Sequence, residues 1–172
     1  MDLKNYIRTV PDFPKTGIMF KDITTLLKDK NAFQYAVEEL YNLSKNKGIT
    51  KVVAIESRGF IFGAILANKL GAGFVPVRKP GKLPAEKLSE TYTLEYGTDS
   101  IEIHKDAIQP GDIVLLHDDL LATGGTMEAA CKLVEKMGAK IAQISFLIEL
   151  SFLNGREKLK DYDVHSIIQY DE

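Results

Sequence analysis

The stretch from Ile113 to Ala130, IVLLHDDLLATGGTMEAA, constrains the fold of this chain more than any other segment. Its apolar start, Ile113–Leu116, is short enough for a strand buried on both faces, and Met127–Met137 repeats apolar residues at helical spacing. We therefore expect a strand, a loop and a helix in this order. In open α/β sheets, ligands bind at the carboxyl ends of the strands, and the unpaired N–H groups and positive dipole of the following helix favour an anion.

The residues of the loop suit a phosphate and a sugar. Small residues let backbone donors close around a phosphate, and two threonine hydroxyls add further donors. The acids Asp118 and Asp119 only accept hydrogen bonds when ionised, so ribose hydroxyls or a Mg²⁺ shell would satisfy them. Adjacent acids before a glycine pair also occur in plain strand-to-helix turns, so this motif does not decide alone. The phosphate-loop residues are Ala122, Thr123, Gly124, Gly125 and Thr126.

Composition limits the classes of protein to which this chain can belong. With 172 residues, 45% hydrophobic content and a net charge of −2, the chain suits one α/β domain over residues 1–172. The near-neutral charge argues against nucleic-acid binding, which needs a basic face. The charged amino terminus and the lack of a long apolar run lead us to expect no secretion or membrane insertion and a cytoplasmic protein. Cys131, the single cysteine, lies on an apolar helical stripe and is expected to be a core thiol.

The rest of the chain alternates between helical and strand patterns. This alternation predicts a doubly wound, mainly parallel sheet with flanking helices. The expected helices are 32–47, 60–70, 127–137 and 156–160, and the expected strands are 52–55, 74–77, 113–117, 141–148 and 164–168.

Between the second and third of these strands lies a segment rich in Lys, Pro and Gly, residues 78–89. It is too long for an ordinary connection, and alternating patches follow it at 92–94 and 100–104. We interpret residues 78–104 as a mobile lid loop on a β-hairpin. A run of charged residues is more often a solvent-exposed face. In this segment, however, the cations Arg78, Lys79 and Lys82 follow the end of a strand, on the side where the site is expected.

Two further segments leave alternatives open. Glu56–Gly59, ESRG, follows a buried strand and precedes a helix, so it is either a second anion loop or a turn with a solvated Arg58. The amino-terminal PDFPKTGIMFKDITTLL either covers a ligand or packs against the core edge. A nucleoside-triphosphatase loop, GxxxxGK[ST], is absent from the sequence, and the three histidines lack paired metal-ligand spacing.

Five ordered motifs carry a resemblance along nearly the whole chain: FPKTGIMFKDIT, ESRGF, GFVPVRKPGKLP, LEYG and DDLLATGGT. Together they resemble the adenine phosphoribosyltransferases of the type I phosphoribosyltransferase family. The resemblance implies the type I fold, with a hairpin lid and a base-covering hood over residues 1–30. It also implies the reaction of adenine with phosphoribosyl pyrophosphate (PRPP) and Mg²⁺, giving AMP and pyrophosphate in purine salvage, and a homodimer.

The resemblance also assigns roles at the sugar and pyrophosphate end. Asp118 and Asp119 would hold the ribose hydroxyls, with the phosphate loop around the 5′-phosphate. Arg58, with Lys79 and Lys82, would neutralise the pyrophosphate, and Arg78 would reach the partner's site across the dimer interface. Such cations make chemical sense, because C1 gains oxocarbenium character as pyrophosphate leaves. Mg²⁺ would be held by PRPP and water, with Asp118 and Asp119 as possible protein ligands.

At the base end, the resemblance places Glu95 as the lid acid that hydrogen-bonds or protonates purine N7, with Tyr96 beside it. The backbone carbonyl and N–H of Met19 would hydrogen-bond to the 6-amino donor and the N1 acceptor of adenine. This pairing disfavours 6-oxopurines, whose edge has the reverse pattern. The neighbouring contacts would come from Phe20, Lys21 and Leu120.

The chain departs from the family pattern at Thr16 and Thr25, where proline is common, at Lys21, where arginine is frequent, and at His117, where an aliphatic residue is usual. Because a strand alternates faces, His117 is expected to point into the core, with its polarity unexplained. Two other functions stay open: a phosphoribosyltransferase for another base, such as xanthine or orotate, and a non-catalytic PRPP-binding regulator.

Overall fold

The computed structural model describes residues 1–94 and 96–172, so Glu95 lies outside the described residues. The chain divides into two compact units, Met1–Glu39 and Leu40–Glu172.

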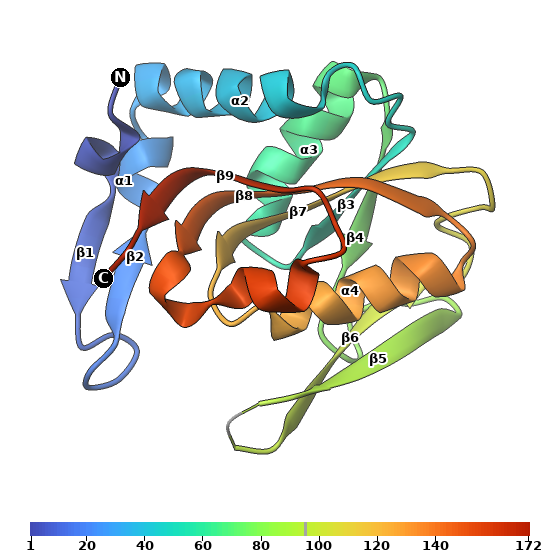
Figure 1. Ribbon diagram of the computed structural model, residues 1–172. Helices are drawn as coiled ribbons and strands as arrows, with labels where there is room; N and C mark the ends of the chain where they lie inside the picture. Colours follow the sequence, from blue (N-terminus) through green and yellow to red (C-terminus); the bar gives the residue numbers. More distant parts are fainter. Residues whose placement is uncertain (95) are drawn as a thin grey trace. The chain divides into compact units, whose positions relative to one another are not determined.

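The larger unit is built on a five-stranded sheet. Its strand order is β4-β3-β7-β8-β9, and each neighbouring pair is parallel. After β3, the first strand of this sheet in the chain, β4 is added on one side of β3 and β7 later on its other side, which confirms a doubly wound parallel sheet (Figure 1). The strands are β3 (Lys51–Ile55), β4 (Gly73–Val77), β7 (Ile113–Leu121), β8 (Lys140–Leu150) and β9 (Val164–Tyr170).

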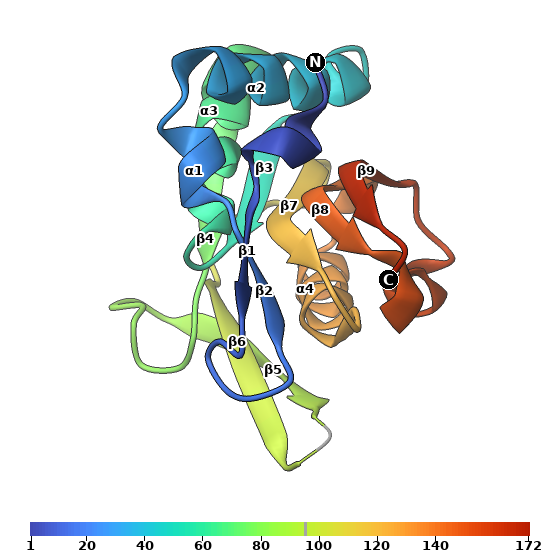
Figure 2. The ribbon, with the colours of Figure 1, turned by 90° about the vertical axis from the view of Figure 1, so that its left-hand side faces the viewer.

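Helices cover both faces of this sheet. The helix α3 (Gly59–Leu70) lies on one face and α4 (Gly125–Lys136) on the other, as Figures 1 and 2 show. The buried stripe of α4 includes Cys131, which is 1% exposed and packs in the main hydrophobic cluster. Burial raises the pKa of this thiol to about 12, so the thiol is un-ionised at neutral pH and packs as a core side chain.

One boundary in the sheet differs from the sequence-based expectation. The pattern predicts a strand ending near His117, with the two acids in the following loop. Instead β7 runs on to Leu121, and Asp118 pairs with Phe146 and Leu120 with Ile148 on β8. The long apolar strand β8 continues the ladder past the acids, so they lie in the last part of a strand.

The predicted hairpin is present. Strands β5 (Lys87–Thr93) and β6 (Thr98–His104) pair antiparallel, and the pairing begins earlier than the patch at 92–94. Leu88 and Tyr92 pack against the core cluster, and Lys136 on α4 contacts Glu90 at 2.6 Å (Nζ to Oε2). The hairpin base is therefore attached to α4, whereas the mobility of the lid stays a prediction.

A short connection, which we call the tail, joins β8 to β9 over residues 151–163. It contains two 3-10 helices, η2 (Ser151–Leu153) and η3 (Gly155–Leu159), before β9 begins. The helix expected at 156–160 is thus present as a 3-10 turn.

The smaller unit has its own hairpin. Strands β1 (Arg8–Pro11) and β2 (Met19–Asp22) pair antiparallel between the 3-10 turn η1 (Leu3–Tyr6) and the short helix α1 (Thr24–Leu27). The next helix, α2 (Lys30–Ser44), continues from this unit into the larger one and ends three residues before the expected boundary at 47. In the described parts of the chain, no helix has the length and apolar character needed to span a membrane.

Candidate active site

The two acids of β7 form a compact carboxylate pair. Asp119 is 7% exposed, and its Oδ2 accepts a hydrogen bond from Nε of Arg58 at 2.7 Å. Asp118 is half-buried, and its Oδ1 accepts the N–H of Asp119 at 2.8 Å. Burial, and then the adjacent Asp119 carboxylate, raise the pKa of Asp118 well above its usual range. The pair thus lies beside the Arg58 guanidinium and can accept further hydrogen bonds from hydroxyl groups.

The phosphate loop, residues 122–126, joins this strand to α4. Gly124 occupies the N-cap position with φ +89°, a left-handed conformation that glycine adopts without steric cost. Within the described residues, no side chain caps the start of α4 by a hydrogen bond. The N–H groups of the first turn therefore remain available to an anion, and the binding of a phosphate by this loop stays a prediction.

The loop between β3 and α3 lies next to the acids. Arg58 begins α3 as its N-cap residue, and its side chain is 52% exposed. Its contact with Asp119 joins the loop after β3 to the last part of β7, two segments that are distant in sequence but meet at the carboxyl edge of adjacent parallel strands. The structure thus brings ESRG and DD together.

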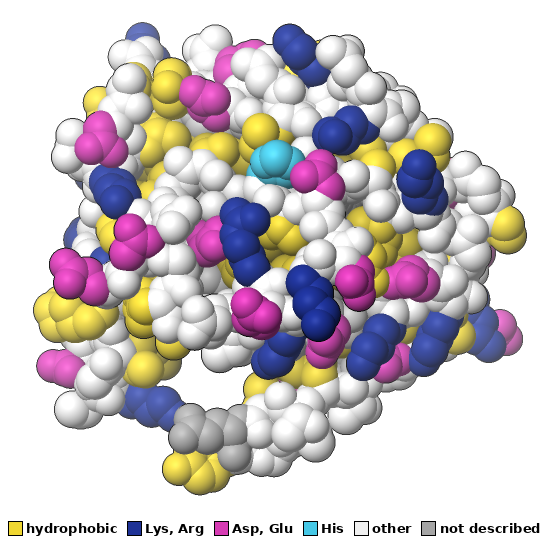
Figure 3. Space-filling model, viewed as in Figure 1, with side chains coloured by type: hydrophobic (Ala, Val, Ile, Leu, Met, Phe, Trp, Pro, Cys, Tyr) yellow, Lys and Arg dark blue, Asp and Glu magenta, His cyan; other side chains and the backbone are white. Residues whose placement is uncertain are grey.

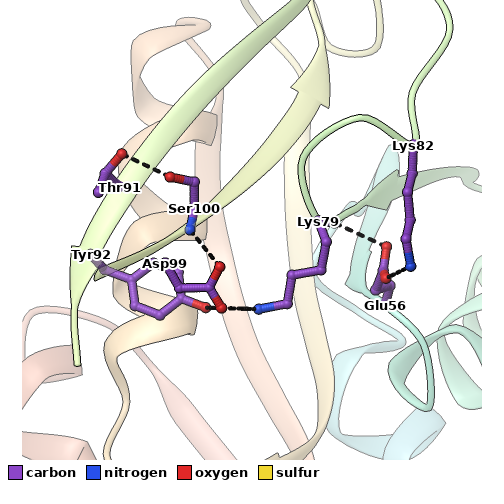
Figure 4. Close-up of polar contacts among 7 residues, drawn as sticks. All are labelled: Glu56, Lys79, Lys82, Thr91, Tyr92, Asp99 and Ser100. Carbon is purple, nitrogen blue, oxygen red and sulfur yellow. Dashed lines mark hydrogen bonds and ion pairs between the residues drawn. The ribbon is translucent and has the colours of Figure 1, made fainter. Parts of the chain in front are cut away.

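A second carboxylate organises the start of the lid. Glu56 Oε2 accepts hydrogen bonds from Nε of Arg78 and the backbone N–H of Lys79, both at 3.0 Å, and Oε1 accepts one from Nζ of Lys82 at 2.6 Å. Figure 4 shows Glu56 between the two lysines. Burial opposes ionisation of Glu56, but the bonds from Lys82, Lys79 and Arg78 outweigh it and lower its pKa. No role was assigned to Glu56 from the sequence. The signal that could have indicated one is its position directly after a buried strand.

The Lys79 ammonium points the other way, toward the hairpin (Figure 4). Its Nζ donates to Asp99 Oδ2 at 2.5 Å and to the Tyr92 hydroxyl at 3.1 Å. Asp99 also accepts the N–H of Ser100 at 2.8 Å, and the Ser100 hydroxyl bonds that of Thr91 at 2.9 Å. Partial burial disfavours the ammonium, but the bonds to Asp99 and Tyr92 outweigh it and raise the pKa of Lys79. No sequence pattern pointed to Asp99 or Tyr92.

Each cation that the resemblance assigns to pyrophosphate is thus paired with a carboxylate of the chain. Basic and acidic side chains are also interspersed over the face of the molecule that Figure 3 shows. An anionic ligand that binds here therefore competes with internal carboxylates for Arg58, Lys79 and Lys82.

The expected base-binding residues lie in two places. Met19, Phe20 and Lys21 are on β2 of the smaller unit, where Met19 is 55% exposed and Lys21 Nζ bonds the Thr9 hydroxyl at 3.0 Å. In the larger unit, Leu120 is half-buried on β7.

Tyr96 is 86% exposed in the turn of the β5–β6 hairpin. Glu95, the expected lid acid, lies outside the described residues. The roles of both residues therefore stay predictions.

His117 is a core residue. It is 0% exposed, its ring lies 6.4 Å from that of Phe62 on α3, and Nδ1 bonds the Ser145 hydroxyl at 2.9 Å. Burial lowers the pKa of His117 to about 4, so its ring is neutral at physiological pH. Its Nε2 has no hydrogen-bond partner among the described residues. The side chain thus points to the α3 face, as strand alternation predicts.

Comparison with known proteins identifies the family and the fold. A family model described as "Phosphoribosyl transferase domain" matches residues 22–171. The adenine phosphoribosyltransferase of Halothermothrix orenii is 59% identical over 169 residues, covering 98% of this chain and 99% of that protein. The chain belongs to the adenine phosphoribosyltransferase family.

Solved structures of this family have the same fold. The adenine phosphoribosyltransferase of Thermoanaerobacter pseudethanolicus superposes with a TM-score of 0.95 at 58% identity, over 98% of each chain. That of Saccharomyces cerevisiae, complexed with an imino-altritol bisphosphate and adenine, gives a TM-score of 0.89 at 43% identity, over 95% of each chain. The type I phosphoribosyltransferase fold is therefore confirmed.

Proposed function

We propose that this chain transfers the 5-phosphoribosyl group of PRPP to N9 of adenine. The bond from C1 of the ribose to the pyrophosphate oxygen breaks, a bond from C1 to N9 forms, and N9 loses its proton, so that AMP and pyrophosphate are the products. The observation that carries this proposal is the Arg58–Asp119 contact, because it joins a cationic loop to a carboxylate pair beside an uncapped helix start. The membership of the family supports adenine as the base.

The sugar and its phosphate would bind at the carboxyl end of β7. Asp118 and Asp119 would accept hydrogen bonds from the two ribose hydroxyls, which donate where a carboxylate accepts. The N–H groups and hydroxyls of the phosphate loop would surround the 5′-phosphate at the start of α4. The ribose would thereby be fixed with C1 toward the Arg58 loop.

The cations of the site would stabilise the departing pyrophosphate. Arg58, Lys79 and Lys82 carry the required charge, and each now contacts a carboxylate of the chain. Binding of PRPP would exchange these contacts for phosphate oxygens, so part of the binding energy is used to separate internal ion pairs. Preorganised cations of this kind typically contribute on the order of a hundred- to a thousandfold in rate each.

The cofactor Mg²⁺ belongs to this proposal. In the described part of the chain, no group of three or more His, Cys, Asp or Glu side chains could hold an ion. The adjacent carboxylates Asp118 and Asp119 have the oxygen donors that Mg²⁺ prefers, and this ion usually binds one or two carboxylates together with substrate phosphates and water. When bound, the ion would neutralise charge that develops on the pyrophosphate oxygens.

Recognition of the base is assigned by family resemblance. The Met19 backbone would pair with the adenine edge, with Phe20, Lys21 and Leu120 close to the ring. Glu95 would hydrogen-bond or protonate N7 during the transfer, with Tyr96 beside it, in a closed site that excludes water.

The proposal includes a homodimer that works in the cytoplasm. Arg78 would reach the site of the partner subunit, although within one chain it contacts Glu56. The single cysteine, buried as a thiol, is compatible with a reducing compartment.

The direct test is product formation. The purified chain is incubated with PRPP, Mg²⁺ and one base at a time, and AMP and pyrophosphate are quantified by chromatography. We expect equimolar AMP and pyrophosphate with adenine. Absence of both products with adenine, or turnover of only another base, would exclude the proposed function.

A further inference from the structure

The phosphate loop packs directly against the backbone of the tail that follows β8. A Cβ atom built on Gly155, the first residue of η3, would lie 2.5 Å from the carbonyl oxygen of Ala122 and 2.8 Å from Cδ1 of Leu121. A Cβ on Gly124 would lie 2.6 Å from the carbonyl oxygen of Gly155. Real side chains do not approach backbone atoms this closely, so the two segments fit only because both residues are glycines.

The tail is fixed in this position by Arg156. Its Nε lies 2.9 and 2.7 Å from the two carboxylate oxygens of Glu149, and its Nη1 donates to the carbonyl of Val164 at 2.9 Å. Glu149 is 3% exposed and also accepts a hydrogen bond from the Ser166 hydroxyl at 2.9 Å. The guanidinium thus ties η3 to the ends of β8 and β9, which are rigid parts of the sheet.

The other end of η3 is anchored in the core. Leu159 is fully buried in the hydrophobic cluster that includes α4 residues such as Met127 and Ala130. Figures 1 and 2 show the tail running beside α4. The segment that begins at Gly155 is therefore held by two anchors, the charged fork at Arg156 and the apolar side chain of Leu159.

This support matters because the phosphate loop has little support of its own. No side chain among the described residues caps α4, and Gly124 has the conformational freedom of a glycine with positive φ. A loop that binds an anion through backbone N–H groups must hold them in place before the anion arrives.

We propose that Gly155, held by the Arg156–Glu149 fork, is a positioning residue that sets the geometry of the phosphate loop and thereby the affinity for the 5′-phosphate. This inference rests on the proposed function, in which the loop binds the phosphate of PRPP. Gly155 itself touches no substrate; it acts by limiting where the carbonyl of Ala122 and the backbone of Gly124 can lie.

The test compares Gly155→Ala with Gly73→Ala. Gly73 is a matched control, because a Cβ there would meet only the flexible Lys51 side chain at 3.1 Å and a carbonyl at 4.0 Å, and its φ is not positive. In Gly155→Ala, we expect the KM for PRPP and the Kd for ribose 5-phosphate, measured by calorimetry, to rise at least about tenfold, with the KM for adenine within about twofold of wild type. Gly73→Ala should keep all three constants.

A second series covers the case in which Gly155→Ala does not fold. Arg156→Lys keeps the charge but cannot span Glu149 and the Val164 carbonyl together, so its Kd for ribose 5-phosphate should lie between those of wild type and Arg156→Ala. The proposal is overturned if Arg156→Ala lowers only the melting temperature and leaves the ribose 5-phosphate Kd unchanged. It is equally overturned if the KM values for adenine and PRPP rise together in Gly155→Ala.

Ribose 5-phosphate binding does not depend on turnover. An inactive wild-type chain would therefore count against the proposed function alone, whereas unchanged sugar-phosphate binding in the variants would count against the positioning role.

Discussion

Charge pairing at single residues is what most distinguishes this site. Asp119, nearly buried, contacts one partly exposed guanidinium, and its neighbour Asp118 has a raised pKa. A hydroxyl-bearing sugar can add donors to such a pair without adding charge. A phosphate group cannot bind directly to this carboxylate pair, because the phosphate and the pair are both negatively charged. At the residue scale, we therefore propose a sugar position at the two acids and phosphate positions at the loops on either side.

The acid predicted to act on the base gives a residue-scale test. In Glu95→Gln, the side chain keeps a hydrogen-bonding group but cannot supply a proton, so we expect kcat to fall by about a hundredfold or more. The Kd for PRPP should change by less than about threefold, because the proposed role of Glu95 concerns the base and not the sugar phosphate. Steady-state kinetics and calorimetry measure the two constants. An unchanged kcat would remove Glu95 from the reaction.

His117 gives a prediction about stability. Its pKa is about 4 in the folded chain and ordinarily 6.5, so between these values the unfolded chain binds a proton that the folded chain does not. The free energy of unfolding should therefore be highest above pH 6.5 and decrease on acidification to pH 4, by up to about 3 kcal/mol. Urea unfolding at pH 7.5 and 5.0 measures the decrease.

The variant His117→Leu isolates this contribution. It places an aliphatic side chain against Phe62 and should reduce the loss of stability between the two pH values. His165→Gln, at an exposed position, controls for removal of a histidine outside the core. An equal loss in wild type and His117→Leu would show that the buried ring is not the cause.

At the scale of elements, the side chain of Lys79 is one of the links between the hairpin and the cationic loop. Asp99 on β6 and the incoming pyrophosphate would compete for Lys79. In Asp99→Asn, the cation loses its anionic partner, so we expect the KM for pyrophosphate in the reverse reaction to fall by about two- to fivefold, a small effect because both side chains are partly exposed. Thr91→Ala, which alters the same cluster without touching Lys79, is the control. Weaker pyrophosphate binding in Asp99→Asn would instead mean that Asp99 positions the lysine for the ligand.

The elements also show how far sequence reasoning reaches. The parallel sheet, the hairpin and the meeting of ESRG with DD were predicted, because short apolar runs and loop positions at strand ends are local signals. The extension of β7 to Leu121 was not predicted, since it depends on pairing with β8. The roles of Glu56, Asp99 and Gly155 were also missed, because each rests on contacts between segments that are distant in sequence.

At the scale of the whole molecule, the homodimer can be tested through Arg78. If Arg78 acts in the partner's site, a heterodimer of one Arg78→Ala and one Asp119→Asn subunit has one intact site and one doubly altered site. The co-expressed heterodimer, purified through two different tags, should therefore regain about half of the wild-type activity, whereas each mutant homodimer is nearly inactive. No recovery in the heterodimer, or a monomer in sedimentation experiments, would contradict the shared site.

The central claim is that this chain makes AMP from adenine. The most direct measurement gives the enzyme PRPP, Mg²⁺ and an equimolar mixture of adenine, hypoxanthine, guanine and xanthine, and separates the nucleotides formed. We predict that AMP exceeds each other nucleotide by about a hundredfold or more, because a site built to pair with the adenine edge leaves polar groups unpaired against a 6-oxopurine. A mixture dominated by any other nucleotide, or free of nucleotides, would contradict the account.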